Sequence, residues 1–172
     1  PGSPAPVADI LRAAERAGYE SWRVDVLLSP LSERLAAPGP VLVQRFFEYL
    51  TAGAVEIAFD PALAYDGELH EALVYLNGLA HRFLSAEFVG SLPCGAAVSA
   101  PVFRSGAAWL IPLWTPGAAK EVVIPIGDAE EVCLTDALNN PRAVPQHAGD
   151  TVTVAIDGDL VYLSGRGGPV LS

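Results

Sequence analysis

The hydrophobic positions of this chain follow two different periods, one in each half. In the first half, apolar residues at helical spacing predict helices over 7–17, 40–52 and 68–85. Between these segments, apolar and polar residues alternate over 19–28 and 54–59, which predicts two strands. Helices and strands that alternate in this order are typical of βα units with a parallel sheet. Two strands are too few for a stable sheet, so we expect this half to be part of a larger arrangement.

The second half changes to a period of two, in short apolar runs separated by turns rich in Gly, Pro, Asn and Asp. Short strands with such turns are the pattern of a β-sandwich. Asp157-Gly158 lies between two alternating runs and predicts a two-residue hairpin. We therefore predict an α+β fold, with a partial βα region over 1–85 and an antiparallel β-sandwich over 86–172. The predicted strands are carried by Val98, Val102 and Phe103, by Trp109, Ile111 and Leu113, by Val122, Ile124 and Ile126, by Val132 and Leu134, by Val152, Val154 and Ile156, and by Val161 and Leu163.

The net charge of −10 narrows the range of partners. A surface of this sign repels phosphate groups, so we expect neither nucleic acid nor an anionic membrane as a partner. No uninterrupted apolar run reaches the length of about 18 residues that a membrane-spanning helix needs. The hydrophobic content of 51% is high, which favours burial of the βα surface against a second chain or another copy of this chain. Pro1-Gly2-Ser3 is typical of a tag-cleavage scar, so the compartment, cytoplasmic or secreted, is left open.

Cysteine and histidine residues do not form a metal-binding pattern. Cys94 and Cys133 are far apart in the sequence, and none of the three histidines lies at ligand spacing from them. We predict no metal site and no cofactor. Two free buried thiols are favoured over a disulfide between these cysteines.

Carboxylates at the rim of the predicted βα sheet are the first candidates for catalysis. Glu56 lies on the second predicted strand and Asp60 at its end. Enzymes built from βα units place their chemistry at the carboxyl ends of such strands. The alternative is structural, because Asp60 precedes Pro61 and suits a turn.

Two aromatic residues are candidates for ligand binding. Trp109 alternates with Ile111 and Leu113, so it belongs to the predicted core. Trp114 falls on the opposite face and near a turn, which makes it the better candidate for a ligand contact. Tyr65, in a predicted turn, is the second candidate.

The order of elements resembles the C-terminal end of clan A glycoside hydrolases, in which a TIM barrel is followed by a small β-sandwich. Residues 40–53 (PVLVQRFFEYLTAG) look like the penultimate barrel helix, and 54–59 look like the last barrel strand. Residues 69–90 look like the final helix and the crossing into the sandwich. The similarity continues in three sandwich segments, 108–114 (AWLIPLW), 135–140 (TDALNN) and 159–163 (DLVYL).

The resemblance implies an O-glycosyl hydrolase architecture in which two glutamates act as acid/base and nucleophile. The strand in the nucleophile's position, 21–29 (SWRVDVLLS), has no glutamate at its end, and Glu33 in the following loop is a poor substitute. The early barrel strands are absent from this chain. We therefore expect a carbohydrate-associated protein that is not catalytic as this chain alone, and an enzyme only if missing strands complete it. The alternative is a non-catalytic assembly module that uses its apolar βα surface.

Overall fold

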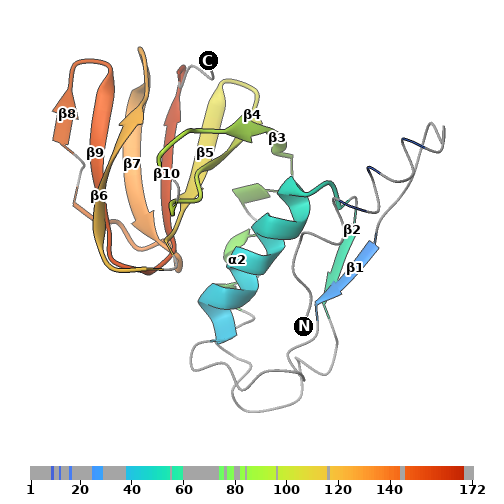
Figure 1. The fold of residues 1–172 in the computed structure, drawn as a ribbon. Helices are drawn as coiled ribbons and strands as arrows, with labels where there is room; N and C mark the ends of the chain where they lie inside the picture. Colours follow the sequence, from blue (N-terminus) through green and yellow to red (C-terminus); the bar gives the residue numbers. More distant parts are fainter. Residues whose placement is uncertain are drawn as a thin grey trace. The chain divides into compact units, whose positions relative to one another are not determined.

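The chain divides into two compact units in the computed structural model, Pro1–Asn77 and Gly78–Ser172. The structure describes residues 9, 12, 16, 25–28, 38–54, 56–59, 74, 75, 77–79, 82, 83, 85–95, 97–115, 117–143 and 146–168. Each unit is described by itself below, and Figure 1 shows the elements of both. The domain boundary between residues 85 and 86 stays a prediction.

The first unit contains the predicted pair of parallel strands. Strand β1 (Asp25–Leu28) pairs with β2 (Glu56–Phe59) in parallel, from Asp25 opposite Glu56 to Leu28 opposite Phe59. Helix α2 (Pro38–Thr51) lies between them in the sequence. Parallel strands need such a crossover, because a tight turn can only join antiparallel neighbours. The partial βα region expected from the periodicity is confirmed.

Helix α2 owes its position to one wide apolar face. Val43 and Phe47 are fully buried, one helical turn apart, and Phe46 packs edge-on against Phe47 with ring centroids 5.4 Å apart. The helix ends where Gly53 takes a φ of +99°, and the amide of Ala54 then donates to the carbonyl of Tyr49 at 3.0 Å. This arrangement satisfies carbonyls that the helix end leaves without partners.

The second unit is an antiparallel β-sandwich, as predicted. One sheet has five strands in the order β3-β4-β5-β10-β7, and the other has three in the order β6-β9-β8. Every pair of strands in both sheets is antiparallel. The five-stranded sheet contains β3 (Glu87–Ser91), β4 (Pro101–Ser105), β5 (Ala108–Leu113), β7 (Glu130–Asp136) and β10 (Val161–Arg166), and the three-stranded sheet contains β6 (Lys120–Pro125), β8 (Gln146–Ala148) and β9 (Thr151–Ile156).

The core of the sandwich is built from alternate residues of both sheets, as the period of two predicted. Trp109, Ile111 and Leu113 enter it from β5, so the assignment of Trp109 to the core is confirmed. Val122 and Ile124 enter from β6 in the opposite sheet. The next residue along β6, Val123, is 58% exposed, which shows how sharply the faces alternate.

Strands β3 and β8 were not predicted, since both lack an alternating apolar pattern. The five residues of β3 are mostly exposed, although Phe88 and Val89 are large and apolar. Strand β8 has three residues and pairs only with β9. Both strands lie at the edge of a sheet, where one side of the backbone has no strand beside it in the described part of the chain.

The predicted hairpin at Asp157-Gly158 is wrong. Strand β9 before it belongs to the three-stranded sheet, and β10 after it belongs to the five-stranded sheet. The connection therefore crosses between the layers of the sandwich, with Gly158 at a φ of +97°. A residue pair of this kind indicates a turn, but the sheet that the next strand joins is set by packing. The two-residue turns of true hairpins are Gly106-Ala107, between β4 and β5, and Gly149-Asp150, between β8 and β9.

A helical segment precedes β3, in agreement with the helix predicted over 68–85. Described residues from Val74 to Phe83 are helical. Phe83 packs against the five-stranded sheet, edge-on to Phe103 with ring centroids 5.1 Å apart and tilted over Tyr162 at 6.3 Å. Among the described residues, no helix is long and apolar enough to cross a membrane.

Asp136 organises the turn that follows β7. Its carboxylate accepts hydrogen bonds from the amides of Leu138 at 2.9 Å and Asn140 at 2.8 Å, and from the side-chain amide of Asn140 at 2.8 Å. Partial burial alone would raise the pKa of Asp136, but these bonds and the charge of Arg142 together lower it below its ordinary value.

Both cysteines are free thiols. Cys94 is half-buried against the sandwich core, and this burial raises the pKa of its thiol. Cys133 is exposed on β7, so the expectation that both thiols are buried is wrong for this residue. The physical reason is that β7 is an edge strand and Cys133 lies on the face of its sheet that is turned away from the core.

Candidate functional site

Of the three candidate catalytic carboxylates, the structure describes Glu56 alone. Glu33 and Asp60 lie outside the described residues, as does Tyr65. Glu56 is the first residue of β2, and the register with β1 places it at the amino end of the parallel pair. At roughly 3.3 Å per residue, it is about 10 Å from the carboxyl end, where βα enzymes carry their chemistry. A catalytic role for Glu33, Glu56 and Asp60 stays a prediction.

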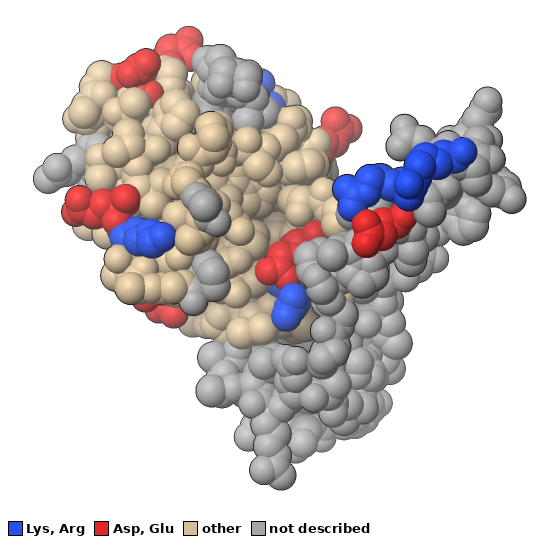
Figure 2. All heavy atoms as spheres, viewed as in Figure 1, with Lys and Arg blue, Asp and Glu red and all other residues tan. Residues whose placement is uncertain are grey.

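The acidic residues of the described part do not form a metal centre. No group of three His, Cys, Asp or Glu side chains in this part could hold an ion. On the face drawn in Figure 2, acidic and basic side chains lie in small separate groups with uncharged residues between them. This distribution agrees with the sequence, in which charges of both signs are spread without runs.

Trp114 lies just beyond β5, on the far side of its sheet from the sandwich core. Its backbone forms an isolated bridge with Ser99, whose amide donates to the carbonyl of Trp114 at 3.0 Å. The residue is only 5% exposed, so its ring does not form an open platform on which a sugar could stack. The role of Trp114 in ligand binding stays a prediction.

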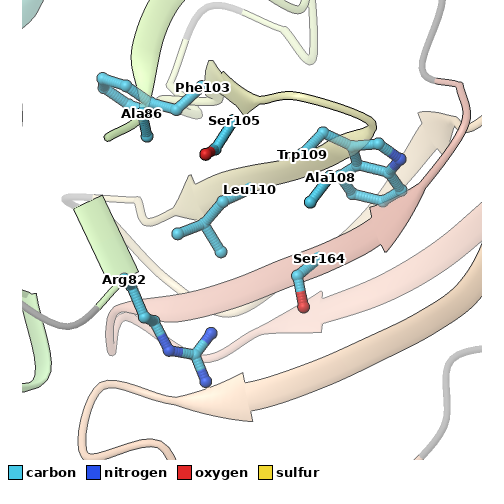
Figure 3. A pocket seen from close by; sticks show the side chains of 8 residues that line it. All are labelled: Arg82, Ala86, Phe103, Ser105, Ala108, Trp109, Leu110 and Ser164. Carbon is cyan, nitrogen blue, oxygen red and sulfur yellow. The ribbon is translucent and has the colours of Figure 1, made fainter. Parts of the chain in front are cut away.

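A pocket with a volume of about 180 Å³ lies on the outer face of the five-stranded sheet (Figure 3). The register of the sheet builds its floor, because Phe103 on β4 is opposite Leu110 on β5, and Leu110 is opposite Ser164 on β10. These side chains form one row across three strands. Among the described residues, the lining consists of Arg82, Ala86, Phe103, Ser105, Ala108, Trp109, Leu110 and Ser164.

Arg82 reaches the pocket from the helical segment before β3. Its guanidinium lies over the ring of Tyr162, 5.2 Å from the centroid, which is a cation–π geometry. Burial lowers the pKa of Arg82, and the neighbouring Tyr162 and Cys133 oppose that shift. An arginine keeps its charge at neutral pH even after such a shift. The pocket therefore has a positive charge at one wall.

Two serine hydroxyls complete the polar part of the pocket. Ser105 shares a hydrogen bond of 2.8 Å with Ser85, and Ser164 projects from β10 on the same side of the sheet as Leu110 (Figure 3). Sequence reasoning missed this site entirely. A lone arginine in a predicted helix is most simply a solvated residue, and only the tertiary structure brings Arg82 to the same pocket as Ser105 and Ser164.

Comparison with known proteins found similarity in structure. No family model and no curated protein matches the sequence. A GH30 endoxylanase from Clostridium papyrosolvens C71 matches 96% of this chain with a TM-score of 0.66 and 14% identity. A family 39 glycoside hydrolase from the gut symbiont Bacteroides cellulosilyticus WH2 matches 93% with a TM-score of 0.68 and 10% identity. This chain has the fold of the part of each of these two glycoside hydrolases that it matches.

A third structure of this kind is the family 30 subfamily 8 xylanase Xyn30A from Clostridium acetobutylicum, with a TM-score of 0.65 and 11% identity over 91% of this chain. At identities this low, the likeness concerns the fold alone. The chain spans 46%, 45% and 38% of the lengths of the endoxylanase, Xyn30A and the family 39 enzyme. The resemblance to the C-terminal part of clan A glycoside hydrolases, inferred from the sequence, is confirmed at the level of fold.

Proposed function

We propose that this protein is associated with carbohydrate and is not a glycosidase as this chain alone. The observation that carries the proposal is the fold, a parallel βα pair followed by an antiparallel sandwich, which is shared with three glycoside hydrolases. The same observation argues against activity of this chain by itself. It spans less than half of each of those enzymes, and the described part contributes one pair of parallel strands.

Retaining glycosidases need two carboxyl groups about 5 Å apart, held at the carboxyl ends of barrel strands. Glu56 is at the amino end of β2, so it is poorly placed to be one of them. A panel of aryl glycosides, incubated with the purified protein, should release no aryl alcohol above the buffer control. Release of the chromophore would contradict the proposal. A Glu56→Gln variant would then show whether that activity depends on Glu56.

A role for Trp114 or Tyr65 in carbohydrate binding is part of the same proposal, and because Trp114 is only 5% exposed, its contact would be through an exposed edge and not through the face of its ring. Titration with soluble polysaccharides should change the tryptophan fluorescence of the parent protein. Trp114→Phe should lose that change if the indole contacts the glycan. Identical curves for the parent and the variant would exclude Trp114 as the contact, and no response to any glycan would exclude binding through it.

The second candidate function is a non-catalytic assembly module. It is favoured by the pair β1 and β2, since a parallel sheet of two strands is marginal and parallel sheets are usually covered on both faces. In that case a second chain or another copy of this chain would complete the βα region. Size-exclusion chromatography with light scattering distinguishes the two candidates. A monomer at every concentration would count against assembly, and a stable dimer or larger species would support it.

A further inference from the structure

The pocket on the outer face of the five-stranded sheet combines a cation with apolar walls. Phe103, Leu110, Ala86 and Ala108 supply the apolar surface, and Arg82 supplies the charge. Such a combination suits a ligand with one negatively charged end and one apolar end. Small-molecule sites are commonly built in this way, from apolar walls and a few polar groups that fix orientation.

The charge of Arg82 is not balanced by an acidic side chain of the described residues. The ion pairs in this part of the chain involve other arginines, such as Arg142 with Asp157 and Arg166 with Glu131. Moving a charged group partly out of water is unfavourable without a partner. The ring of Tyr162 offsets part of that cost through its face. The planar guanidinium still has donors that match the two oxygens of a carboxylate.

The pocket offers room for a small molecule. Its volume is about 180 Å³. An engineered protein cavity of about 150 Å³ can hold benzene. The hydroxyl of Ser164 lies in the same row as Leu110 and lines the same pocket as Arg82, so it is a second donor on this surface. A carboxylic acid with a body about as large as one aromatic ring therefore matches the space and the donors.

We propose that this pocket binds a small monocarboxylic acid, with the carboxylate at Arg82 and the apolar body over Leu110 and Phe103. The proposal rests on the geometry of the second unit and is independent of the proposed carbohydrate function. The outer face of the five-stranded sheet would then be a binding site for small organic acids.

Titration with benzoate tests the proposal, followed by the amide shifts of Leu110 and Ser164 in nuclear magnetic resonance spectra. We expect saturable shifts at these residues. Benzamide has the same size without the charge, so it should bind at least about tenfold more weakly, which corresponds to 1.4 kcal/mol. Equal affinities for the two molecules, or no saturable shift with benzoate, would overturn the proposal.

Two variants locate the site. Arg82→Gln removes the charge, and Ala108→Leu fills the pocket from an exposed position on β5 while leaving the charge in place. Each should weaken benzoate binding at least about tenfold. Arg142→Gln is the matched control, because it changes the net charge equally at a residue outside the pocket, and it should keep the parent affinity.

The fold of each variant is checked by its thermal unfolding. If Arg82→Gln does not fold, Ala108→Leu and the comparison with benzamide still decide the question. Unchanged benzoate affinity in a folded Arg82→Gln variant or in Ala108→Leu would overturn the proposal, as would an equal loss of affinity in Arg142→Gln.

Discussion

The two units of this protein differ in how they complete a hydrophobic core. In the second unit, two antiparallel sheets face each other, and residues such as Ile111 and Ile124 from opposite layers fill the space between them. In the described part of the first unit, helix α2 connects a pair of parallel strands. An antiparallel sandwich can form both layers from neighbouring segments of chain, whereas a parallel sheet gains a strand only through each long crossover. The described residues of the second unit therefore form a two-layered core, and those of the first unit form one parallel pair with a crossover helix.

Truncation of a buried side chain on α2 should nevertheless lower the free energy of unfolding as much as a truncation in the sandwich core. Phe47 is fully buried, so Phe47→Ala should lower the free energy of unfolding by about 4 kcal/mol through lost burial and a cavity. The change is read from urea unfolding followed by far-ultraviolet circular dichroism. Gln44→Ala on the same helix is the control and should stay within about 0.5 kcal/mol. A small loss for Phe47→Ala would mean that the partial core is loosely packed.

Neighbouring positions on β6 provide the sharpest comparison in the second unit. Ile124 is fully buried and Val123 is 58% exposed. Ile124→Ala should cost about 3 kcal/mol, and Val123→Ala less than about 1 kcal/mol. Urea unfolding followed by tryptophan fluorescence measures both, because Trp109 and Trp114 lie in this unit. Similar losses for the two variants would contradict the alternation of faces on which the sandwich is built.

Close packing of the sandwich can also be tested by adding an atom. A Cβ at Gly165 would lie 2.5 Å from Cζ2 of Trp109 and 3.1 Å from the carbonyl oxygen of Glu130. Gly165→Ala should therefore cost about 2 kcal/mol through overpacking. At Gly117 the nearest atom to an added Cβ is 3.9 Å away, so Gly117→Ala should be close to neutral in the same unfolding assay. If Gly165→Ala is equally neutral, the indole of Trp109 can move aside and the core is less tightly packed than in the structure.

The smallest expected effect is electrostatic and depends on pH. Asp136→Asn removes the charge that accepts three hydrogen bonds at the end of β7, and because the site is near the surface we expect a loss of about 1 kcal/mol at neutral pH. The pKa of Asp136 is lowered in the folded protein. Its contribution is therefore complete above the unfolded pKa of about 3.9 and disappears as the pH falls through the folded value.

Unfolding of the parent and of Asp136→Asn, compared at neutral pH and in acid, measures this contribution. The two proteins should converge in stability as the solution becomes acidic. Asp159→Asn is the control, at an exposed carboxylate, and should match the parent at neutral pH. A constant difference between Asp136→Asn and the parent at all pH values would show that the hydrogen-bond geometry, and not the charge, stabilises the turn.

Much of the fold was predictable because local periodicity carries it. The alternation of Trp109, Ile111 and Leu113 identified a strand with one buried face, and the structure has those residues in the core. Strands β3 and β8 were not predictable, since their residues are mostly exposed and hold their place through backbone pairing with β4 and β9. Asp157-Gly158 was misread for a related reason, because its turn signal does not say which sheet the next strand joins.

The sequence alone determined the elements with a periodic apolar pattern, the buried face of those strands and the likeness to the end of a glycoside hydrolase, because these depend on the order and spacing of residues along the chain. Only the tertiary structure decided what lies next to what. It brought Arg82 to a row of side chains from β4, β5 and β10, and it placed Glu56 at the amino end of β2. Sheet membership and the packing of the helical segment on the sheet arise between distant segments, and the local pattern of either segment does not encode them.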